Sequence, residues 1–355
     1  MGLERKKRVA VGLSGGVDSS TAAALLAAEG YEVAGFMLRV QEAAGAGAEA
    51  AADARAVCAR LGVPFYALDE TERFEREVVR YFAEEYARGR TPNPCAVCNA
   101  RLKFGAMLER ALAIGADYVA TGHYARVERG AEGRFLLRKG KDAARDQSYF
   151  LAFLSQEQLS RALFPLGGLT KTEVRELARR LGLPTAGKGE SREVCFVPGK
   201  DYRRFLRERG LVPRRPGEVV DAAGRRLGRH EGVAFFTVGQ RRGLGVAAGS
   251  PRYVAALDAE NNRVVIGGAE ELLCRGFCVE RCNWIALADP SEPFEATVKI
   301  RYKHPGAPAR VIPRGRGEAE VIPNEPLRAV TPGQAAVFYK GDLVLGGGWI
   351  RNTWR

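Results

Sequence analysis

Two adjacent glycines flanked by hydroxyl side chains near the amino terminus are typical of a phosphate-binding loop. Residues 9–20 read VAVGLSGGVDSS, a short apolar run followed by the Ser/Gly-rich segment 14–20 and then an Ala/Leu-rich helical pattern. Adjacent glycines let backbone N–H groups converge, and the start of the helix offers unpaired donors and a positive dipole end. No lysine lies between Gly12 and Ser20. The segment is therefore not a Walker loop, which needs a lysine that reaches the outer phosphates.

Two thiols three residues apart form a second candidate reactive group. Residues 91–99 read TPNPCAVCN, a proline-bounded loop that offers Cys95 and Cys98 ahead of a helix expected to begin near Leu102. A cysteine near a helix amino terminus and beside basic side chains has a depressed pKa, so both thiols are expected to be thiolates. A third cysteine, Cys195, follows later. A structural zinc ion needs four ligands, and neither a second C-x-x-C nor paired histidines accompany these three, so a thiol system is favoured over zinc.

The other four of the seven cysteines are interpreted as packing residues. An odd number at uneven spacing does not make a disulfide framework. Cys58 falls in an Ala-rich helical stretch and is expected to be a small core residue. Cys274, Cys278 and Cys282 are spaced by four in a β-branched, aromatic context. On a strand this spacing points all three to one face, so a buried sheet face is favoured over a metal site there.

Strand-like and helical patterns alternate through the first 121 residues. The strand-like runs are Val9–Leu13, Glu32–Leu38, Pro64–Leu68 and Tyr118–Thr121, and the helical patterns are Ser19–Ala28, Glu49–Leu61, Phe74–Tyr86 and Leu102–Ile114. This alternation predicts an α/β fold with a parallel sheet and helices on both faces. Ligands on such sheets bind beyond the carboxyl ends of the strands, where the glycine loop, Met37 and Gly122 lie. Capping boxes starting at Ser155 and Thr170 predict two further helices.

The composition after about residue 200 changes and becomes basic. The whole chain has 55 Lys+Arg against 42 Asp+Glu, a net charge of +13, which points to a polyanionic partner, with nucleic acid as the leading candidate. Residues 203–229 hold nine arginines against three acids, interrupted by prolines and a glycine, and are interpreted as a linker that opens a small basic domain. From about Glu271 onward, short strands with turns, including a hairpin over 332–345, predict a closed or nearly closed β barrel.

The chain shows no sign of a membrane or export segment. No apolar run approaches the roughly 20 residues that cross a bilayer. The few charged residues before the first strand leave no room for a signal peptide. A cytoplasmic protein without a membrane partner is expected.

Seven motifs occur together and in a fixed order. They are Ser14–Ser20, Asn93-Pro94-x-x-x-Cys98-Asn99, Thr121–Tyr124, Asp146–Leu151, Val194–Phe196, Gly239–Gly245 and Thr331–Gln334. On these motifs the chain resembles the tRNA-specific 2-thiouridylase (MnmA/TrmU) family over nearly its whole length. The resemblance implies an ATP-pyrophosphatase catalytic domain in residues 1–203, a small central tRNA-binding domain in 204–272 and a β-barrel domain in 273–355. It also implies ATP-dependent 2-thiolation of the wobble uridine of tRNA.

The resemblance also implies roles for individual residues. ATP, with Mg²⁺ offsetting the charge of the pyrophosphate, would be held by Gly12, Leu13, Ser14, Gly15, Gly16, Val17, Asp18, Ser19, Met37 and Gly122. Cys98 would be the catalytic nucleophile, and Cys195 would carry a persulfide sulfur delivered by a donor such as a cysteine desulfurase or a relay protein. The tRNA would be touched by Asn93, Pro94 and Cys95 at the target base, and by His123, Arg145, Asp146, Gln147, Arg301, Tyr302 and Gln334.

Two residues depart from the family's usual pattern. Arg145 replaces the commoner lysine, a change that keeps a phosphate contact with altered geometry. Cys95 stands where many members carry an aspartate, so a carboxylate role does not transfer. Cys95, Cys98 and Cys195 are then three thiolates that suit a [4Fe-4S] cluster with one iron open to sulfide, and the C-x-x-C favours this reading. In the other mechanism Cys195 hands on its persulfide sulfur while Cys98 resolves it as a disulfide, an exchange that needs no Cys95.

Three other functions are consistent with parts of the sequence. An ATP-pyrophosphatase-type ligase that adenylates a carboxylate needs only the glycine loop, and it leaves the cysteines and the basic segment unexplained. A 4-thiouridine synthase would normally carry an additional RNA-binding domain ahead of the loop, which here begins at residue 12. A non-enzymatic RNA-binding module would account for the charge and not for the loop.

Overall fold

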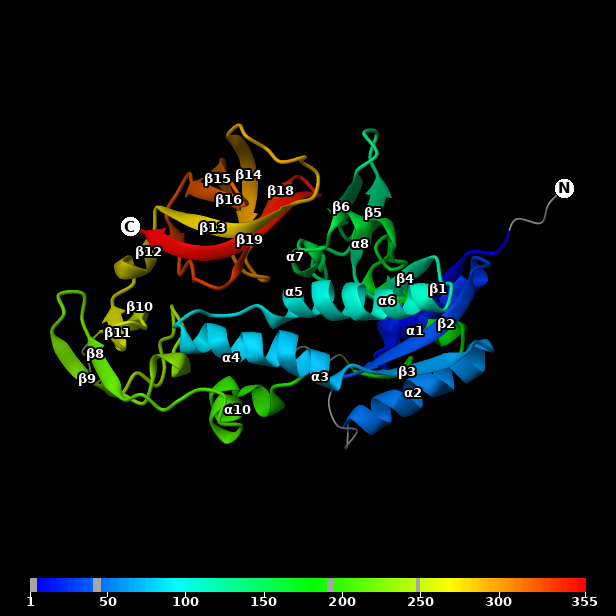
Figure 1. Cartoon of the computed structure of the whole chain (residues 1–355), viewed down its shortest axis with the longest axis horizontal. Coiled ribbons are helices and arrows are strands. Elements are labelled where there is room, and N and C mark those ends of the chain that lie inside the picture. Colours follow the sequence, from blue (N-terminus) through cyan, green and yellow to red (C-terminus); the bar gives the residue numbers. More distant parts are fainter. Residues whose placement is uncertain (1–4, 41–45, 190–193, 247–249) are drawn as a thin grey trace. The chain divides into compact units, whose positions relative to one another are not determined.

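The computed structural model describes residues 5–40, 46–189, 194–246 and 250–355 of the chain (Figure 1). The chain divides into two compact units, each built from separate stretches of sequence. The first unit comprises Met1–Glu77, Cys95–Arg192 and Asp342–Val344. The second comprises Val78–Pro94, Glu193–Gly341 and Leu345–Arg355. Among the described residues, no helix is both long and apolar enough to span a bilayer.

A five-stranded parallel sheet forms the centre of the first unit. Its order is β3-β2-β1-β4-β7, with β1 (Arg8–Gly12), β2 (Glu32–Arg39), β3 (Phe65–Asp69), β4 (Tyr118–Thr121) and β7 (Ala162–Leu163). Helices α1 (Val17–Ala28) and α2 (Ala46–Leu61) pack on it, and their residues share one apolar core with β1. Cys58 of α2 lies in this core, and burial raises the pKa of its thiol to about 11, as expected for a packing residue. The parallel α/β sheet predicted from the sequence is confirmed.

The helical patterns predicted over 74–86 and 102–114 each belong to a longer helical stretch that contains a π-helical turn. The first consists of α3 (Thr71–Phe74), the π turn Glu75–Val79 and α4 (Arg80–Ala87), and the second of α5 (Pro94–Cys98), the π turn Asn99–Ala106 and α6 (Met107–Ala113). The expected helix start near Leu102 was therefore wrong, since the helix begins at Pro94. Proline is tolerated at a first helical position, where its missing N–H has no partner to lose. Cys95 and Cys98 thus lie in the first turns of a helix and not in the loop before it.

The rest of the first unit supplies a hairpin and three helices. The hairpin is β5 (Ala125–Arg129) and β6 (Phe135–Lys139), and the helices are α7 (Ser148–Leu151), α8 (Gln156–Ser160) and α9 (Lys171–Arg180). Ser155 caps α8 and Thr170 caps α9, each within a complete capping box, as predicted. Asp342–Val344 also belong to this unit, where Leu343 pairs with Arg138 of β6.

The basic stretch expected to be a linker is folded. It forms α10 (Tyr202–Glu208), β8 (Gly217–Val220) and β9 (Arg226–His230). These strands join β10 (Tyr253–Asp258) and β11 (Arg263–Gly267) in a four-stranded sheet of order β10-β11-β8-β9. The linker interpretation was wrong. Pro213 and Pro216 lie between α10 and β8, and Gly217 is the first residue of β8, so these residues interrupt neither element.

A closed six-stranded barrel follows in the second unit. Its strands are β13 (Gly276–Trp284), β14 (Phe294–Lys299), β15 (Ala307–Gly315), β16 (Glu318–Pro323), β18 (Ala335–Lys340) and β19 (Leu343–Trp354). They follow the order β13-β16-β15-β14-β18-β19, and β13 also pairs with β19, which closes the barrel. Two short strands, β12 (Leu273–Cys274) and β17 (Leu327–Arg328), pair beside it. The predicted barrel and the hairpin of β18 and β19 are confirmed.

The three cysteines spaced by four do not share one regular strand. Cys274 is buried on β12, whereas Cys278 and Cys282 lie on β13 and are half-buried. Arg281 between them has a φ of 51°, and the pairing register shifts there, so the alternation of faces is broken by a bulge. The expectation of one common face was therefore wrong. Burial raises the pKa of the Cys282 thiol to about 12, which fits packing.

Candidate active site

The glycine loop connects the end of β1 to the start of α1, at the carboxyl edge of the parallel sheet. Gly15 has a φ of 72°, and a Cβ on it would lie 2.7 Å from the Cα of Ala50. Only glycine satisfies both conditions. Gly16 is the N-cap of α1 with a φ of −102°, and a Cβ there would come no closer than 3.4 Å, to Ser14 Oγ. The two glycines therefore differ: Gly15 is required by the fold, and Gly16 keeps the helix start uncovered.

The loop hydroxyls are used mainly to hold the loop itself. Ser19 Oγ accepts a hydrogen bond from the N–H of Ser14 at 3.1 Å and lies 3.2 Å from the carbonyl oxygen of Gly16. Ser20 Oγ donates to the same Gly16 carbonyl at 2.9 Å. Ser19 and Ser20 are buried, whereas Ser14 is exposed. Of these three serines, Ser14 is therefore the one placed to contact a phosphate.

A lysine that the loop itself lacks is brought to it from α9. Lys171 Nζ lies 2.6 and 2.7 Å from the two carboxylate oxygens of Asp18, which also accepts a hydrogen bond from Tyr124 Oη at 2.8 Å. Lys171 is 8% exposed and is the first residue of α9, directly after the cap Thr170. Burial and the neighbouring Asp18 raise the pKa of the Tyr124 phenol, so it remains a donor. The site thus contains an ammonium group beside the start of α1.

Gly122 brings the end of β4 into direct contact with the start of α1. A Cβ on Gly122 would lie 2.7 Å from the carbonyl carbon of Asp18 and 2.7 Å from the backbone nitrogen of Ser19. The next residue, His123, is 7% exposed, and its Nδ1 lies 2.7 Å from Thr121 Oγ1. Burial, aided by the charge of Lys103, holds the pKa of His123 well below its usual range, so its ring is neutral. Glycine at 122 is what lets this motif reach the nucleotide loop.

The Asp146-Gln147 motif is hydrogen-bonded to the His123-Tyr124 motif. Gln147 accepts from the N–H of Tyr124 through its side-chain oxygen at 3.0 Å and donates its own N–H to the Tyr124 carbonyl at 2.9 Å. Asp146 is 5% exposed, and its carboxylate accepts bonds from the N–H of Gly140 and from the N–H and hydroxyl of Ser148. Both residues order this part of the unit, and their contact with tRNA stays a prediction.

The cysteine pair lies on a helix that is anchored on both sides. Cys95 and Cys98 of α5 are half-buried. After them, the side-chain amide of Asn99 donates to the carbonyl of Phe150 at 3.2 Å. Cys195 is exposed and belongs to the second unit, beside Phe196, whose ring packs 5.2 Å from that of Phe82. Within the described residues, no group of three or more His, Cys, Asp or Glu side chains is arranged to hold a metal ion.

The segment that leads into α5 is bound by the Thr331–Gln334 motif of the second unit. Gln334 Nε2 donates to the carbonyls of Thr91 at 3.2 Å and Pro92 at 3.0 Å, and the N–H of Thr91 donates to the carbonyl of Pro332 at 2.8 Å. Gly333 has a φ of 88°, and a Cβ there would lie 2.9 Å from the backbone nitrogen of Thr91. Gln334, expected to touch tRNA, is therefore also a structural partner of this segment.

Further contacts complete the anchoring of the same segment. Arg90, adjacent to Thr91, is ion-paired with Glu85 and with Glu280, each at 2.9 Å. Asn93 is 5% exposed.

The remaining predicted tRNA residues of the second unit lie after β14. Arg301 is exposed, and Tyr302 is half-buried below Lys299, whose Nζ is 5.9 Å from the centroid of the Tyr302 ring.

Comparison with known proteins covers all three predicted parts of the chain. Three family models match, described as a tRNA methyl transferase HUP domain over residues 7–199, a tRNA methyl transferase PRC-barrel domain over 203–268 and an aminomethyltransferase beta-barrel domain over 274–350. A tRNA-specific 2-thiouridylase MnmA of Geobacter metallireducens is 50% identical, covering 97% of each chain. Its counterpart in Heliobacterium modesticaldum is 51% identical over 97% of this chain and 92% of that protein.

The chain belongs to the tRNA-specific 2-thiouridylase MnmA family. A further member, from Carboxydothermus hydrogenoformans, is 49% identical and is matched over 98% of each chain. The family resemblance predicted from the seven motifs is confirmed. Sequence reasoning missed Lys171, although a capping box immediately before it marked it as the first residue of a helix.

Proposed function

We propose that this protein uses ATP to replace the C2 oxygen of the wobble uridine of tRNA with sulfur. One observation carries the proposal. The buried Lys171 binds Asp18 beside the glycine loop at the carboxyl edge of the sheet, and the same unit carries two thiols on α5. A nucleotide-activating loop and thiol groups in one unit fit a reaction that needs both. We place this reaction in the cytoplasm.

The first half of the reaction is adenylation. The C2 oxygen of uracil is a poor leaving group, so it attacks the α-phosphorus of ATP, and pyrophosphate departs. The N–H groups at the start of α1 and the ammonium of Lys171 would stabilise the negative charge on that pyrophosphate. Mg²⁺ would lower the phosphate charge further. Both carboxylate oxygens of Asp18 already bind Lys171 and one also binds Tyr124, so Mg²⁺ would be held chiefly by the phosphates themselves.

The second half is sulfur transfer. A persulfide delivered to Cys195 by a donor such as a cysteine desulfurase or a relay protein attacks C2 through its terminal sulfur, and AMP leaves. The Cys98 thiolate then attacks the Cys195 sulfur, which releases the thiolated base and forms a Cys98–Cys195 disulfide. An external thiol reductant must reduce that disulfide before the next turnover. The exposure of Cys195 suits access by a donor protein.

A [4Fe-4S] cluster on Cys95, Cys98 and Cys195 is the alternative means of sulfur delivery. The variant Cys95→Ser distinguishes the two, because persulfide exchange does not use Cys95. Full thiolation by this variant under anaerobic conditions with a persulfide donor, together with iron-free wild-type protein, removes the cluster. Stoichiometric iron in the wild type that is lost in the variant, along with thiolation, removes the exchange mechanism.

The residues named for tRNA remain part of this proposal. They are Asn93, Pro94 and Cys95 at the base, and His123, Arg145, Asp146, Gln147, Arg301, Tyr302 and Gln334 elsewhere. We also propose domain boundaries after residues 203 and 272, near the ends of the three family matches.

Analysis of tRNA nucleosides tests the function as a whole. Cells that lack the protein are expected to lose 2-thiouridine at the wobble position and to keep 4-thiouridine. Complementation with the wild-type gene should restore the modification, and Cys98→Ala should not. Unchanged 2-thiouridine in the deletion strain would leave a carboxylate-adenylating ligase as the better interpretation. Loss of 4-thiouridine in its place would assign a different tRNA thiolase.

A further inference from the structure

The segment that follows α9 is held against both ends of α2. Near the carboxyl end of α2, the guanidinium of Arg60 donates to the carbonyl of Leu181 at 3.4 Å. Near the start of the same helix, Lys188 forms ion pairs with Glu49, at 2.8 Å, and with Asp53. Residues 181–188 therefore follow α2 from its end back to its start.

The start of α2 is also the part of that helix that packs on the glycine loop. A Cβ on Gly15 would lie 2.7 Å from the Cα and from the carbonyl oxygen of Ala50. Ala50 lies between Glu49 and Asp53 in the sequence. The turn of α2 that binds Lys188 is therefore the turn that contacts the nucleotide loop.

Lys188 neutralises two acids that lie on one face of α2. Glu49 and Asp53 are four residues apart, a spacing at which two like charges on a helix repel each other. The Lys188 side chain is 32% exposed and that of Asp53 is 20% exposed. Asp53, followed by Glu49, raises the pKa of Lys188, so the ammonium group stays charged at neutral pH. The contact holds the chain at residue 188 on the helix.

Cys195 follows Lys188 by seven residues and has a second anchor on its other side. Seven residues of extended chain span at most about 25 Å, so the contact at Lys188 limits how far Cys195 can lie from the start of α2. The next residue, Phe196, is 3% exposed, and its ring centroid lies 5.2 Å from that of Phe82 and 5.5 Å from that of Phe205. Cys195 itself is exposed. The chain around this thiol is thus held by Lys188 in the first unit and by Phe196 in the second.

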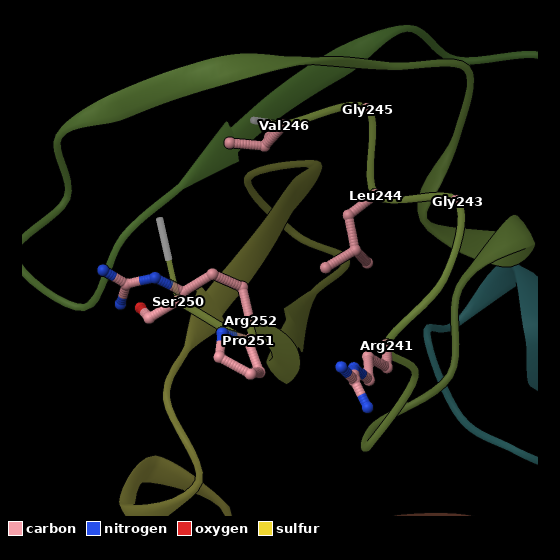
Figure 2. Close-up of a pocket in the computed structure, with 8 residues that line it drawn as sticks. All are labelled: Arg241, Gly243, Leu244, Gly245, Val246, Ser250, Pro251 and Arg252. Atoms are coloured by element: carbon pink, nitrogen blue, oxygen red, sulfur yellow. The ribbon is translucent and has the colours of Figure 1, made fainter. Parts of the chain in front are cut away.

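The pocket at the Gly239–Gly245 motif supplies no such anchor. Its volume is about 480 Å³, and its described lining contains arginine, serine, proline, glycine and aliphatic residues but no cysteine and no acid. Figure 2 shows the side chain of Leu244 directed into it. No group of this lining takes part in the proposed sulfur transfer.

We propose that Lys188 is a positioning residue for sulfur transfer, which holds the chain before Cys195 to the turn of α2 that packs on the glycine loop. The inference rests on the proposed function. The rate of transfer depends on how closely the sulfur on Cys195 is placed at the activated base, because a displacement of about 1 Å can cost on the order of 100-fold in rate. Adenylation uses the glycine loop and Lys171 and does not use Cys195. Loss of Lys188 should therefore slow the second half of the reaction and spare the first.

Lys188→Met tests this split in a single turnover of persulfide-loaded protein with ATP and tRNA. We expect thiolation to slow by about 10-fold, with pyrophosphate release nearly unchanged. Lys188→Arg keeps the charge and should thiolate at close to the wild-type rate. Lys141→Met is the matched control, since it removes a surface lysine of the same unit that pairs with Glu173 at 3.0 Å, and it should change neither rate. Ion pairs at the surface contribute little to stability, so these variants should fold.

Reversal of the charges separates the ion pairs from other effects of substitution at residue 188. Lys188→Glu brings a third acid to Glu49 and Asp53, so it should slow thiolation more than Lys188→Met does. The double variant Lys188→Glu/Asp53→Lys puts the cation on α2 and the acid on the segment, and it should recover most of the rate. A purely local loss of packing at residue 188 would not be repaired by the second substitution.

Disulfide formation gives a measurement that needs neither ATP nor tRNA. With glutathione disulfide as the oxidant, two exchange steps join Cys98 to Cys195 and release two glutathione thiols. This reaction should be slower in Lys188→Met and recover in the charge-reversed double variant. Wild-type rates of thiolation and disulfide formation in Lys188→Met would overturn the proposal, as would equal losses of pyrophosphate release and thiolation. Wild-type protein that forms the disulfide and does not thiolate tRNA would count against the proposed function, and the disulfide rates would still decide the role of Lys188.

Discussion

The side-chain amide of Gln334 is bonded to the backbone carbonyl of Thr91, seven residues before Cys98 in the chain. A second bond from the same nitrogen reaches the carbonyl of Pro92. A barrel residue therefore holds the segment that leads into α5 through two backbone carbonyls, which no side-chain substitution in that segment removes. Two roles are proposed for Gln334: it positions this segment, and it contacts tRNA. The rate of thiolation and the affinity for tRNA report on these roles separately.

Gln334→Glu should lower the rate of thiolation at saturating tRNA by a larger factor than it weakens tRNA binding. A carboxylate cannot donate to the carbonyls of Thr91 and Pro92, so the segment would shift, and a displacement of about 1 Å can cost on the order of 100-fold in rate. Single-turnover thiolation and filter binding measure the two quantities. The control is Asn324→Ala, an exposed barrel residue. Weakened tRNA binding with an unchanged saturated rate would instead show that RNA contact is the main duty of Gln334.

Lys171→Met should abolish adenylation and also lower stability. Loss of the ammonium group leaves Asp18 with an uncompensated negative charge at the start of α1, where the phosphates would bind. Loss of one partner of a buried pair costs roughly 3–5 kcal/mol, and less here because the Asp18 side chain is 32% exposed. We expect the free energy of unfolding to fall by about 1–3 kcal/mol.

The measurements for Lys171 are tRNA-dependent pyrophosphate release and urea unfolding. Lys141→Met is the matched control, since Lys141 pairs with Glu173 at the surface at 3.0 Å. Asp18→Asn combined with Lys171→Met should regain stability without regaining pyrophosphate release. Undiminished release by Lys171→Met alone would exclude the lysine from the nucleotide site.

The two loop glycines should respond differently to substitution. Gly15→Ala forces a left-handed conformation on alanine and a clash with the backbone of Ala50, so it should lower the melting temperature as well as activity. A Cβ at position 16 has room within the protein, so the main effect of Gly16→Val should be to block the start of α1. Gly16→Val is therefore expected to lose less stability than Gly15→Ala, to bind tRNA normally and to release no pyrophosphate. Normal pyrophosphate release by Gly16→Val contradicts the loop assignment.

Acid should destabilise the protein partly through His123. The folded pKa of this buried ring lies well below the unfolded value near 6.5, so below about pH 6.5 the unfolded chain takes up a proton that the folded protein does not. Stability therefore falls as the pH falls, by up to about 1.4 kcal/mol per pH unit for this one group. His123→Asn keeps a hydrogen-bonding group for Thr121 and should flatten urea-derived stability between pH 6.5 and 5. An unchanged pH slope would show that His123 titrates normally.

Local patterns were sufficient to predict the sheet and the barrel. The alternation of strand-like and helical runs through Thr121 marks β1 to β4, and the apolar runs are clearest in β1 and β4, whose central residues are buried on both faces. The capping boxes at Ser155 and Thr170 have the same local character. The start of α5 was missed because Pro92 precedes it, Pro94 is its first residue, and a π turn, Asn99–Ala106, disturbs the helical spacing that follows.

The site was only partly predictable for a different reason. Asp18 and its lysine are 153 residues apart, and nothing local to either residue indicates its partner. Likewise the arginine count of residues 203–229 says nothing of how many find carboxylates once the strands pair. Motif resemblance located the glycines and the cysteines. Only the tertiary contacts showed that Lys171 reaches Asp18.

The long sequence separation of the Lys171–Asp18 pair also bears on how the protein folds in the cell. During synthesis α1 leaves the ribosome well before α9, so the glycine loop exists for a time without its ammonium group. Full nucleotide binding is then a property of the completed unit and not of the nascent one. A ligand that binds only the folded form stabilises it, by about 2.7 kcal/mol at 100 times its dissociation constant. ATP bound at this loop would therefore stabilise the completed unit.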